Sequence, residues 1–415
     1  MMRCRSVPLD SPDMPADLRR ARVLVLGASG FVGARLTERL VSEYGARVRV
    51  FVRAPMRAAV IARLPIDIVA GDALDRQAVS AAAEGCSVLF NCVKGKGADP
   101  DTRRAVDADA AGVVVEAARH SGARVVHVST MAVYDRPADG EFDETSPPAR
   151  RGDAYTDGKM DGERLALDLG RRYGVPVAVI QPSVVYGPGA GVYGTEIIQE
   201  LTTSRVPLVD GGAGICNAVY IDDVVSALLM AAVSDRAAGE RLLISGSEYP
   251  TWRDFFGAFE RMIGAERTVS LTRAEAHGLW RRSRRRPSLL AELWRAVRDD
   301  HQLRRRLLAT REGRLVRQIA RTAVPPVWRS GLRVSAGAEC ADLPAAGPQP
   351  PLVPMRPWVI DYMALRARVR CTKARELLGY RPAIDFVTGM QRTESWARWA
   401  GLIPCAADAA ASDSR

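Results

Sequence analysis

The 415-residue sequence is poor in lysine, histidine and aromatic residues and has no long apolar run. Only four lysines stand among its 59 basic residues, so arginine supplies almost all of the positive charge. There is no stretch of 18 apolar residues and no N-terminal segment of signal-peptide type, so we expect a cytoplasmic protein without a transmembrane helix. The four histidines are scattered, and we expect no metal site built from protein ligands.

Cysteine is present but forms no recognisable pair in the sequence. The seven cysteines contain no C-x-x-C motif, and an odd number in a long chain indicates free thiols in a reducing compartment. Hydrophobic residues make up 47% of the chain, which is enough for a sizeable core. A length well above that of one average domain favours two lobes.

The positive charge is concentrated in one segment. Residues 271–330 contain 16 arginines and 5 acidic residues, which accounts for the formal net charge of +11. The rest of the chain is balanced, so the composition does not indicate a nucleic-acid-binding fold. Aromatic residues that could stack on bases are also few, and we expect no nucleic-acid partner.

The motif around which the chain is organised is RVLVLGASGFVG, residues 22–33. Its apolar run is typical of a strand buried on both faces of a parallel sheet. Gly27 permits a tight turn out of the strand, Gly30 leaves room for backbone beside a pyrophosphate, and Gly33 lets helix and strand approach closely. Free N–H groups at the helix start then face the phosphates. We therefore predict a dinucleotide site, with a purely structural turn as the alternative.

Strand and helix patterns alternate after this motif, which predicts right-handed βαβ crossovers and an α/β fold with a doubly wound parallel sheet of Rossmann type. Ligands bind beyond the carboxyl ends of such strands, so the residues that follow each strand are the candidates for the site. The expected strands are 48–52, 66–70, 88–92, 125–129 and 177–181, and the expected helices are 31–44, 76–83, 103–121 and 154–173.

We divide the chain into a dinucleotide-binding domain and a smaller substrate-binding lobe that carries a helical, arginine-rich insertion. In the lobe, Thr251 is expected to cap a helix. The expected ranges are 20–181 for the domain, 182–404 for the lobe, about 271–370 for the insertion, and 1–19 and 405–415 for disordered tails; within the insertion, helices are expected over 287–320 and a loop over 336–357.

The insertion allows three interpretations. A helical lid over the substrate, whose arginines meet an anionic group such as a diphosphate, is favoured. Peripheral contact of residues 281–330 with an anionic membrane, or with a partner, is the second. Nucleic-acid binding is the third and the least favoured, for the reason given above.

Residues at the ends of the next strands are candidate cofactor contacts. Arg53 stands where an acidic residue would accept the ribose hydroxyls of NAD. Because a guanidinium suits the 2′-phosphate of NADP instead, we favour NADP over NAD, with an arginine in a solvent-facing loop as the alternative. Asp72 is expected to accept a hydrogen bond from the adenine, and the backbone of Asn91, Cys92 and Val93 to pass beside the cofactor.

Tyr155 and Lys159 lie four residues apart at the start of an expected helix and therefore share a face. A phenol has a reference pKa of about 10, and a neighbouring ammonium lowers it toward the working range of a base. Such a pair is rarely accidental with so few lysines, although an exposed helix pair is the alternative. The preceding strand ends in Ser129 and Thr130, whose hydroxyls could hold a substrate oxygen against Tyr155.

Together these motifs resemble the extended short-chain dehydrogenases/reductases of the NAD-dependent epimerase/dehydratase family. The matching pieces are GASGFVG at 27–33, GDALD at 71–75, STMAVYD at 129–135, YTDGK at 155–159, PSVVYGPG at 182–189 and YIDDV at 220–224. The resemblance covers about 21–265. It implies that Tyr155 is the acid/base, that Lys159 orients it and binds the nicotinamide ribose, and that Thr130 is the third catalytic group. The residues expected at the cofactor are Gly27, Ser29, Gly30, Phe31, Val32, Gly33, Arg53, Asp72, Ala73, Asn91, Cys92, Val93, Ser129, Lys159 and, on the resemblance alone, Pro182, Ser183 and Val184.

One departure from the family narrows the chemistry. Met131 and Ala132 follow Thr130 where sugar dehydratases of the family often carry an Asp-Glu pair, so dehydration by their mechanism is not expected. We expect an NAD(P)-dependent oxidoreductase that transfers hydride between nicotinamide and a secondary alcohol or ketone, on a small and possibly anionic substrate. Two alternatives stay open: a nucleotide-sugar epimerase with tightly bound NAD, and a non-catalytic protein that senses the cofactor or associates with a membrane. A homodimer is one option for its assembly.

Overall fold

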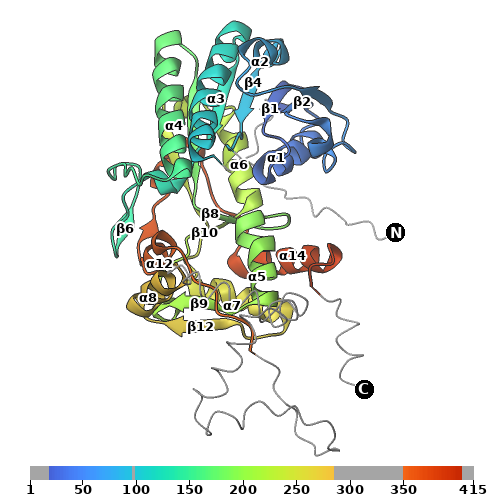
Figure 1. The fold of residues 1–415 in the computed structure, drawn as a ribbon. Helices are drawn as coiled ribbons and strands as arrows, with labels where there is room; N and C mark the ends of the chain where they lie inside the picture. Colours follow the sequence, from blue (N-terminus) through green and yellow to red (C-terminus); the bar gives the residue numbers. More distant parts are fainter. Residues whose placement is uncertain (1–17, 96–98, 285–348, 404–415) are drawn as a thin grey trace, which may run out of the picture.

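A parallel sheet of seven strands forms the centre of the larger half of the molecule (Figure 1). The computed structural model describes residues 18–95, 99–284 and 349–403. The strand order is β11-β7-β5-β4-β1-β2-β3, and every pairing in the sheet is parallel. The predicted doubly wound sheet is confirmed. Its strands are β1 (Arg22–Leu26), β2 (Arg47–Val52), β3 (Asp67–Ala70), β4 (Val88–Asn91), β5 (Arg124–Val128), β7 (Val177–Pro182) and β11 (Arg241–Ile244).

The strand order reverses between β1 and β4. From β1 the chain proceeds to β2 and β3 on one side, and then returns to place β4, β5, β7 and β11 on the other. The crevice at such a switch point, beyond the carboxyl ends of the strands, is where open α/β sheets bind ligands. The glycine motif follows β1 and Cys92 follows β4, so the topology brings both predicted elements to this crevice.

Helices cover both faces of the sheet (Figure 1). On one face lie α1 (Phe31–Ser42) and α6 (Ile221–Ala231), and on the other lie α2 (Arg76–Ala83), α3 (Pro100–Ser121) and α4 (Ala154–Tyr173). The boundaries of α1, α2, α3 and α4 match those of the four expected helices to within three residues.

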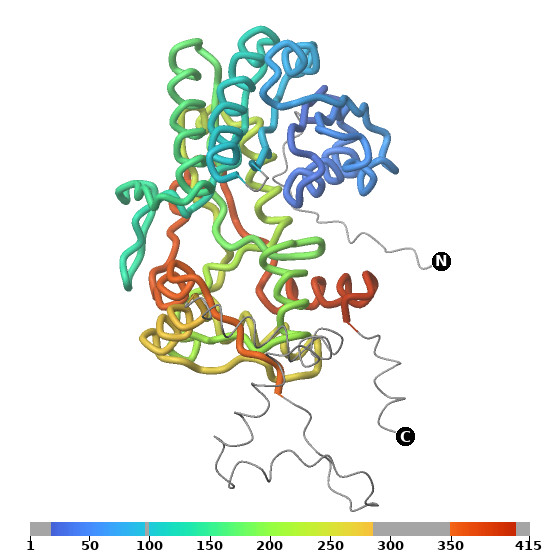
Figure 2. Tube along the Cα trace, viewed as in Figure 1, coloured from blue at the N-terminus to red at the C-terminus, as the bar shows by residue number. Residues whose placement is uncertain are grey.

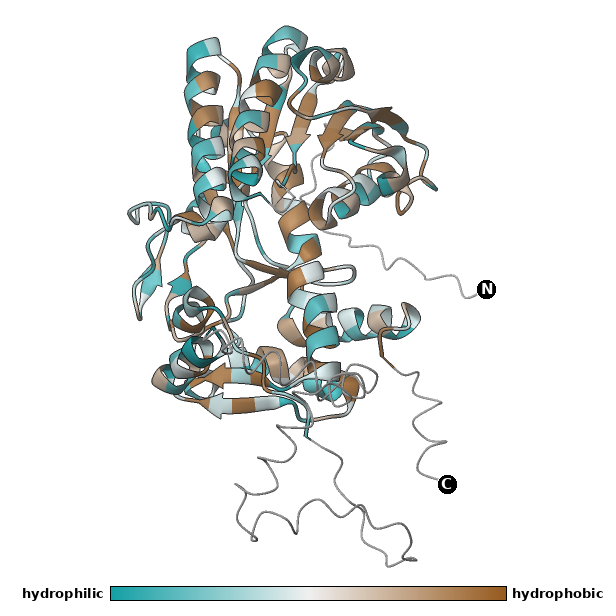
Figure 3. Cartoon of the chain, viewed as in Figure 1, coloured by the Kyte–Doolittle hydropathy of each residue, from teal (hydrophilic) through white to brown (hydrophobic). Residues whose placement is uncertain are grey.

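The two faces enclose separate hydrophobic clusters. Val23 and Val25 of β1 belong to one cluster, and Leu24 and Leu26 belong to the other. Because successive side chains point to opposite faces of a strand, burial on both faces explains the continuous apolar run in the sequence. The apolar strands stand out between more polar helices in Figure 3.

The smaller half contains short helices and two-stranded parallel ribbons. Thr251 and Asp254 form a capping box at the start of its helix α7, which confirms the predicted cap. The helices are α5 (Glu196–Thr203), α7 (Trp252–Ile263), α8 (Arg273–Ser283), α12 (Pro357–Met363), α13 (Thr372–Leu378) and α14 (Phe386–Trp399); the ribbons are β8 (Val184–Tyr186) with β10 (Ala218–Tyr220), β9 (Val206–Val209) with β12 (Thr268–Leu271), and β6 (Glu141–Phe142) with β13 (Arg368–Val369). Short helical turns occur in both halves of the molecule. They are η2 (Pro55–Ala58), η3 (Met131–Val133), η4 (Gly191–Thr195), η5 (Asp210–Gly212) and η6 (Asp235–Ala237).

The C-terminal segment links the two halves. In Figure 2 it runs in orange and red, with α12 against α8, and α13 against β11 and α6. Strand β11 comes from the segment assigned to the substrate-binding lobe, yet it pairs with β7 and completes the sheet. The sheet therefore draws on both predicted domains, and the boundary near residue 182 stays a prediction.

Several expectations fall outside the described residues. These are the helices over 287–320, most of the loop over 336–357, most of the surface over 281–330, the tail over 405–415, and the predicted tail up to residue 17. The adjoining Leu18 is 1% exposed and belongs to the core. Within the described ranges, no helix combines the length and hydropathy needed to cross a bilayer.

Candidate active site

The glycine loop between β1 and α1 has the shape that a pyrophosphate needs. Gly27 has φ +76°, and a Cβ there would lie 2.5 Å from the carbonyl oxygen of Cys92. A Cβ at Gly33 would lie 2.5 Å from the carbonyl oxygen of Gly27. Gly30 is the N-cap of α1 and offers no side-chain acceptor to the first turn, so the N–H groups of that turn are left for a ligand. Bare backbone at a helix N-terminus fits the phosphates of a dinucleotide.

The other predicted contacts around β1, β2 and β3 lie at the carboxyl edge of the sheet. Ser29 is exposed, while Phe31 and Val32 are half-buried in the first turn of α1. Arg53 is exposed directly after β2. Asp72 is exposed after β3, and its Oδ1 accepts a hydrogen bond of 3.0 Å from the backbone N–H of Leu74. The half-buried Ala73 follows it.

The end of β4 contributes its backbone to the site, while one of its side chains points into the sheet. The side chain of Asn91 is buried, with Nδ2 3.0 Å from Nδ1 of His127 and Oδ1 accepting from the N–H of Val93. The backbone of Cys92 packs against Gly27, and the carbonyl of Val93 accepts a hydrogen bond from Lys159. Cys92 and Val93 therefore lie beside the glycine loop, as expected.

Lys159 is 4% exposed and is held by three acceptors. Its Nζ donates to the carbonyl oxygens of Val93 at 2.7 Å and Val128 at 3.2 Å, and it lies 3.2 Å from Oδ1 of Asp107. Asp107 is itself buried on α3, and its Oδ1 also accepts from the backbone N–H of Gly95. The ammonium is thus paired with a carboxylate that the sequence analysis did not identify.

Two glycines on α4 allow this ion pair to form. A Cβ at Gly158 would lie 3.1 Å from Cβ of Asp107, and one at Gly162 would lie 2.5 Å from the carbonyl oxygen of Asp107. Helices α3 and α4 therefore approach closely around Lys159. The spacing Gly158-x-x-x-Gly162 was the signal in the sequence for a close helix partner, although it does not say which residue of that partner faces Lys159.

The hydroxyl of Thr130 lies close enough to that of Tyr155 to affect its pKa. Thr130 is 7% exposed, and its Oγ1 accepts from the N–H of Ala132, which caps η3. Although 38% of Tyr155 is exposed, burial raises the pKa of its hydroxyl, and the hydroxyl of Thr130 acts in the opposite direction. The predicted lowering of this pKa by Lys159 is therefore wrong for this structure, because burial raises the pKa and the charge of Asp107, which is paired with Lys159, adds to the rise. The ammonium of Lys94 lies over the ring, 4.8 Å from its centroid.

Ser129, predicted as a cofactor contact, has its hydroxyl committed elsewhere. Its Oγ donates to Oε2 of Glu163 at 2.7 Å. Glu163 also accepts from Gln181 at 2.8 Å and from Arg241 at 3.0 Å, and burial raises the pKa of this carboxyl. The network braces β5, α4, β7 and β11 directly behind Thr130.

The predicted residues after β7 are buried at the same edge as Thr130. Pro182 ends β7 and pairs with Ile244 of β11. The hydroxyl of Ser183 donates to Oγ of Ser245 at 3.0 Å, and Val184 begins β8 with 1% exposure. The structure thus brings the three strand ends together with Tyr155 and Lys159.

A dinucleotide loop, a helix with Tyr155 and Lys159, and a strand end with Thr130 now meet at one edge of one sheet. The model of the NAD dependent epimerase/dehydratase family matches residues 23–244. The chain belongs to this family. The match ends at the last residue of β11, so it covers the sheet except for Arg22 at the start of β1 and includes all of the predicted site residues.

Curated relatives and solved structures agree with this membership. The chain is 29% identical over 219 residues to the 4-hydroxy-2-methyl-3-oxo-4-farnesyl-3,4-dihydroquinoline-1-oxide ketoreductase of Stigmatella aurantiaca, which is 51% of this chain and 64% of that protein. It is 30% identical over 247 residues to the dTDP-glucose 4,6-dehydratase of Streptomyces niveus, which is 54% of this chain and 72% of that protein. The matched part thus spans less than two thirds of the ketoreductase.

Among solved structures, the UDP-glucuronic acid 4-epimerase of Bacillus cereus, in complex with NAD, superposes with a TM-score of 0.61 and 16% identity, covering 91% of this chain and 99% of that one. The UDP-glucose 4-epimerase of Thermotoga maritima, with UDP-glucose, gives a TM-score of 0.62 and 17% identity over 91% and 99% of the two chains. At these identities the likeness shows the fold alone.

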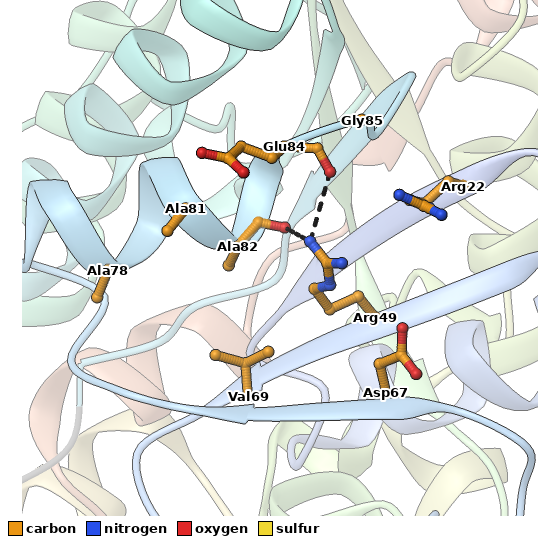
Figure 4. Close-up of a pocket in the computed structure, with 9 residues that line it drawn as sticks. All are labelled: Arg22, Arg49, Asp67, Val69, Ala78, Ala81, Ala82, Glu84 and Gly85. Carbon is orange, nitrogen blue, oxygen red and sulfur yellow. Dashed lines mark hydrogen bonds between the residues drawn. The ribbon is translucent and has the colours of Figure 1, made fainter.

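A surface depression of about 630 Å³ lies at the opposite end of the sheet (Figure 4). Its wall includes Arg22 and Asp67, which begin β1 and β3. Arg49 reaches across it to donate to the carbonyl oxygen of Ala82 at 2.6 Å, near the end of α2. The depression lies away from the carboxyl ends of the strands, so it does not belong to the candidate site.

Proposed function

We propose that the protein is an NAD(P)-dependent oxidoreductase that interconverts a secondary alcohol and a ketone, with Tyr155 as the proton-transferring group. The observation that supports this most directly is the placement of the hydroxyls of Tyr155 and Thr130 within interaction range of each other, at the edge of the sheet where Lys159 and the glycine loop also lie. A phenol paired with a hydroxyl can bind one substrate oxygen between them.

Each residue then has a separate task. The glycine loop and the first turn of α1 bind the pyrophosphate. When bound, the nicotinamide supplies or accepts the hydride. Thr130 positions the substrate oxygen, and Tyr155 donates its proton to that oxygen or accepts it from there. Lys159, held between the ends of β4 and β5, is assigned to the ribose of the nicotinamide half.

We favour the direction of carbonyl reduction. In that direction Tyr155 donates its proton to the carbonyl oxygen as hydride arrives. The curated relative named as a ketoreductase is consistent with this direction. A nucleotide-sugar epimerase with tightly held NAD is the second candidate, supported by the NAD and UDP-glucose in structural neighbours.

The proposed cofactor is NADP, and the residue that supports it is Arg53. It stands exposed after β2, where its guanidinium can pair with a 2′-phosphate. Arg53→Asp should shift the ratio of kcat/KM values for NADPH and NADH by about tenfold or more toward NADH, since one charged contact is lost and a ribose acceptor is gained. An unchanged ratio contradicts the assignment.

Two measurements on the purified full chain test the function. Nucleotide released on denaturation is identified by mass, and ketones and nucleotide sugars are screened with NADPH and NADH by the absorbance of the reduced nicotinamide. We expect exchangeable cofactor and oxidation of NADPH by at least one ketone. Stoichiometric NAD in the purified protein, with interconversion of epimeric nucleotide sugars, would establish the second candidate instead.

A further inference from the structure

Four side chains from separate segments pack together near the candidate active site. They are Arg136, in the loop after η3, Tyr193 of η4, Trp252 of α7 and Tyr362 of α12; we call them the Arg136 cluster. Cζ of Arg136 lies 4.5 Å from the ring centroid of Tyr362. The rings of Trp252 and Tyr362 are 5.5 Å apart, and those of Tyr193 and Trp252 are 6.4 Å apart.

The cluster contains hydrogen-bond donors without acceptors. Nε of Arg136, Nε1 of Trp252 and the hydroxyl of Tyr362 are buried and have no hydrogen-bond partner in the described part of the chain. Trp252 is 3% and Tyr362 7% exposed. The arginine and tryptophan nitrogens can only donate. Since a buried donor is costly to leave unpaired, three of them in one place indicate that an acceptor from outside this set completes the cluster.

No carboxylate of the described residues forms an ion pair with the guanidinium of Arg136, and the charge of Asp135 acts on it only as the smallest of several causes. The carboxylate of the adjacent Asp135 accepts from the backbone N–H of Arg136 rather than from its side chain. Burial is the main cause that lowers the pKa of Arg136, and the charge of Arg151 adds to it. Because arginine keeps its proton in proteins, a buried guanidinium is relieved by an anion rather than by neutralisation.

The cluster borders the candidate active site through one residue. The hydroxyl of Tyr193 lies within electrostatic range of both Tyr155 and Arg136. A substrate that spans this range would have its reacting oxygen at Tyr155 and a second group at Arg136. None of the four residues belongs to the motifs from which the sequence site was predicted.

We propose that the Arg136 cluster binds an anionic oxygen group of the substrate, so that the substrate class is a ketone or secondary alcohol carrying a carboxylate or a phosphate ester. The guanidinium provides a charge-assisted hydrogen bond, and Trp252 and Tyr362 provide further donors. The identity of the reacting end rests on the proposed function, whereas recognition of the anionic end does not.

Binding of matched probes to the full chain, in the presence of NADP⁺ or NAD⁺, tests this proposal by titration calorimetry. The probes are 4-acetylbenzoate and 4-acetylphenyl phosphate, with the neutral 4-acetylbenzamide as reference. We expect one anionic probe to bind about tenfold or more tightly than the amide, which identifies the carboxylate or the phosphate as the better ligand. Equal affinity for the amide and both anions, or no measurable binding of either anion, overturns the proposal.

Three variants assign the preference to the guanidinium. Arg136→Met should abolish the preference for the anion, and Arg136→Lys should restore part of it because the charge returns without the fork of donors. Arg273→Met is the matched control, since Arg273 lies on the neighbouring α8 and is already paired with Asp361 of α12; it should keep the preference. An Arg136→Met variant that folds, as judged by its melting curve, and still prefers the anion refutes the role of Arg136.

The outcome is separable from that of the proposed function. Tyr155→Phe should keep the preference for the anion over the amide, because all three probes share the acetyl group that would lie at Tyr155 and differ only at the other end. Reduction of neutral ketones without any preference for anions would leave the oxidoreductase standing and reject the anion site. Arg136-dependent binding of an anionic probe without turnover of any ketone would support the anion site and reject the oxidoreductase.

Discussion

The two regions that meet at Tyr155 are built in different ways. On the nucleotide side, the buried polar groups have partners. Lys159 donates to the carbonyl of Val93, Asp107 accepts from the N–H of Gly95, and Thr130 accepts from the N–H of Ala132. In the Arg136 cluster, three donors are buried with no acceptor within the described ranges. Lys159, Asp107 and Thr130 of the first region have partners as folded, whereas the three donors of the second gain an acceptor only with a ligand.

Charge shows the same difference. Lys159 is buried with a carboxylate, and His127 is buried without a charge because burial lowers its pKa to about 3. Neither solution is open to Arg136, which cannot lose its proton and whose nearest carboxylate, that of Asp135, accepts from its backbone N–H and not from its side chain. The contrast indicates that the buried charged groups of the nucleotide side stabilise the fold, whereas the buried donors of the Arg136 cluster bind a ligand.

The largest expected effect concerns the group that both regions share. Tyr155→Phe removes the transferable proton and should lower kcat by about 10²- to 10⁴-fold, the range for loss of a general acid. Steady-state kinetics on any substrate found in the screen measures this, and cofactor affinity should stay nearly intact because the glycine loop is untouched.

Tyr173→Phe provides the control for this variant. Tyr173 ends the same helix α4, far along the chain from Tyr155, and it should change kcat by no more than about twofold, as for substitutions away from a site. Turnover by Tyr155→Phe at the rate of this control would remove Tyr155 from the mechanism.

The next effect tests whether the buried groups of the nucleotide side depend on their partners. Asp107→Ala leaves the buried ammonium of Lys159 with only two carbonyl acceptors, and we expect the free energy of unfolding to fall by about 3 kcal/mol or more. Denaturant titration measures it. Asp161→Ala is the control: Asp161 pairs with Arg104 and Arg150 at the surface of α4, and exposed pairs contribute about 1 kcal/mol or less. Equal losses of unfolding free energy in the two variants would mean that the buried ion pair of Lys159 stabilises the fold no more than a pair at the surface.

A smaller effect appears in the pH dependence of stability. The pKa of His127 is about 3 in the folded chain and about 6.5 when exposed by unfolding. The unfolded state therefore binds the proton more tightly, and stability is lost as pH falls from about 6.5 toward 3, by up to about 1.4 kcal/mol per pH unit. His127→Asn keeps an acceptor for Asn91 without titrating in this range.

The measurement is the difference in unfolding free energy between the unsubstituted chain and His127→Asn at pH 7, 6 and 5. We expect this difference to shift in favour of the variant as pH falls. His120→Asn, which removes an exposed imidazole at the end of α3, controls for loss of a histidine outside the sheet. A difference that does not change with pH would mean that His127 has the same pKa in the folded and unfolded states.

The sequence was sufficient for the nucleotide side because the constraints there are local. Gly27 and Gly33 are required because neighbouring backbone lies 2.5 Å from where a Cβ would stand. Such requirements produce a glycine spacing that is recognisable in the sequence. Strand ends in a parallel sheet share an edge, so Thr130 and Lys159 could be placed together without coordinates.

The same reasoning failed where a contact depends on packing between distant segments. Asp107 faces Lys159 only because α3 and α4 approach through two glycines of α4. The prediction for the pKa of Tyr155 failed as well. Lys159 is paired with Asp107, and burial raises the pKa of Tyr155 instead of Lys159 lowering it. The Arg136 cluster joins residues up to 226 positions apart in the chain, and no spacing in the sequence records it.

The smallest expected effect would sharpen the comparison most. Replacing a partnered buried group destabilises a fold, whereas replacing an unpaired buried charge with a hydrophobic side chain of similar length is neutral or stabilising. Arg136→Met should therefore leave the free energy of unfolding unchanged or raise it by about 1 kcal/mol, in denaturant titration without ligand. Arg151→Met, which removes a donor to the carbonyl of Tyr134 at 2.9 Å, should instead lower it by about 1 kcal/mol. A clear loss of stability in Arg136→Met would show that its contact with the Tyr362 ring supports the fold, and the two regions would then differ in location but not in kind.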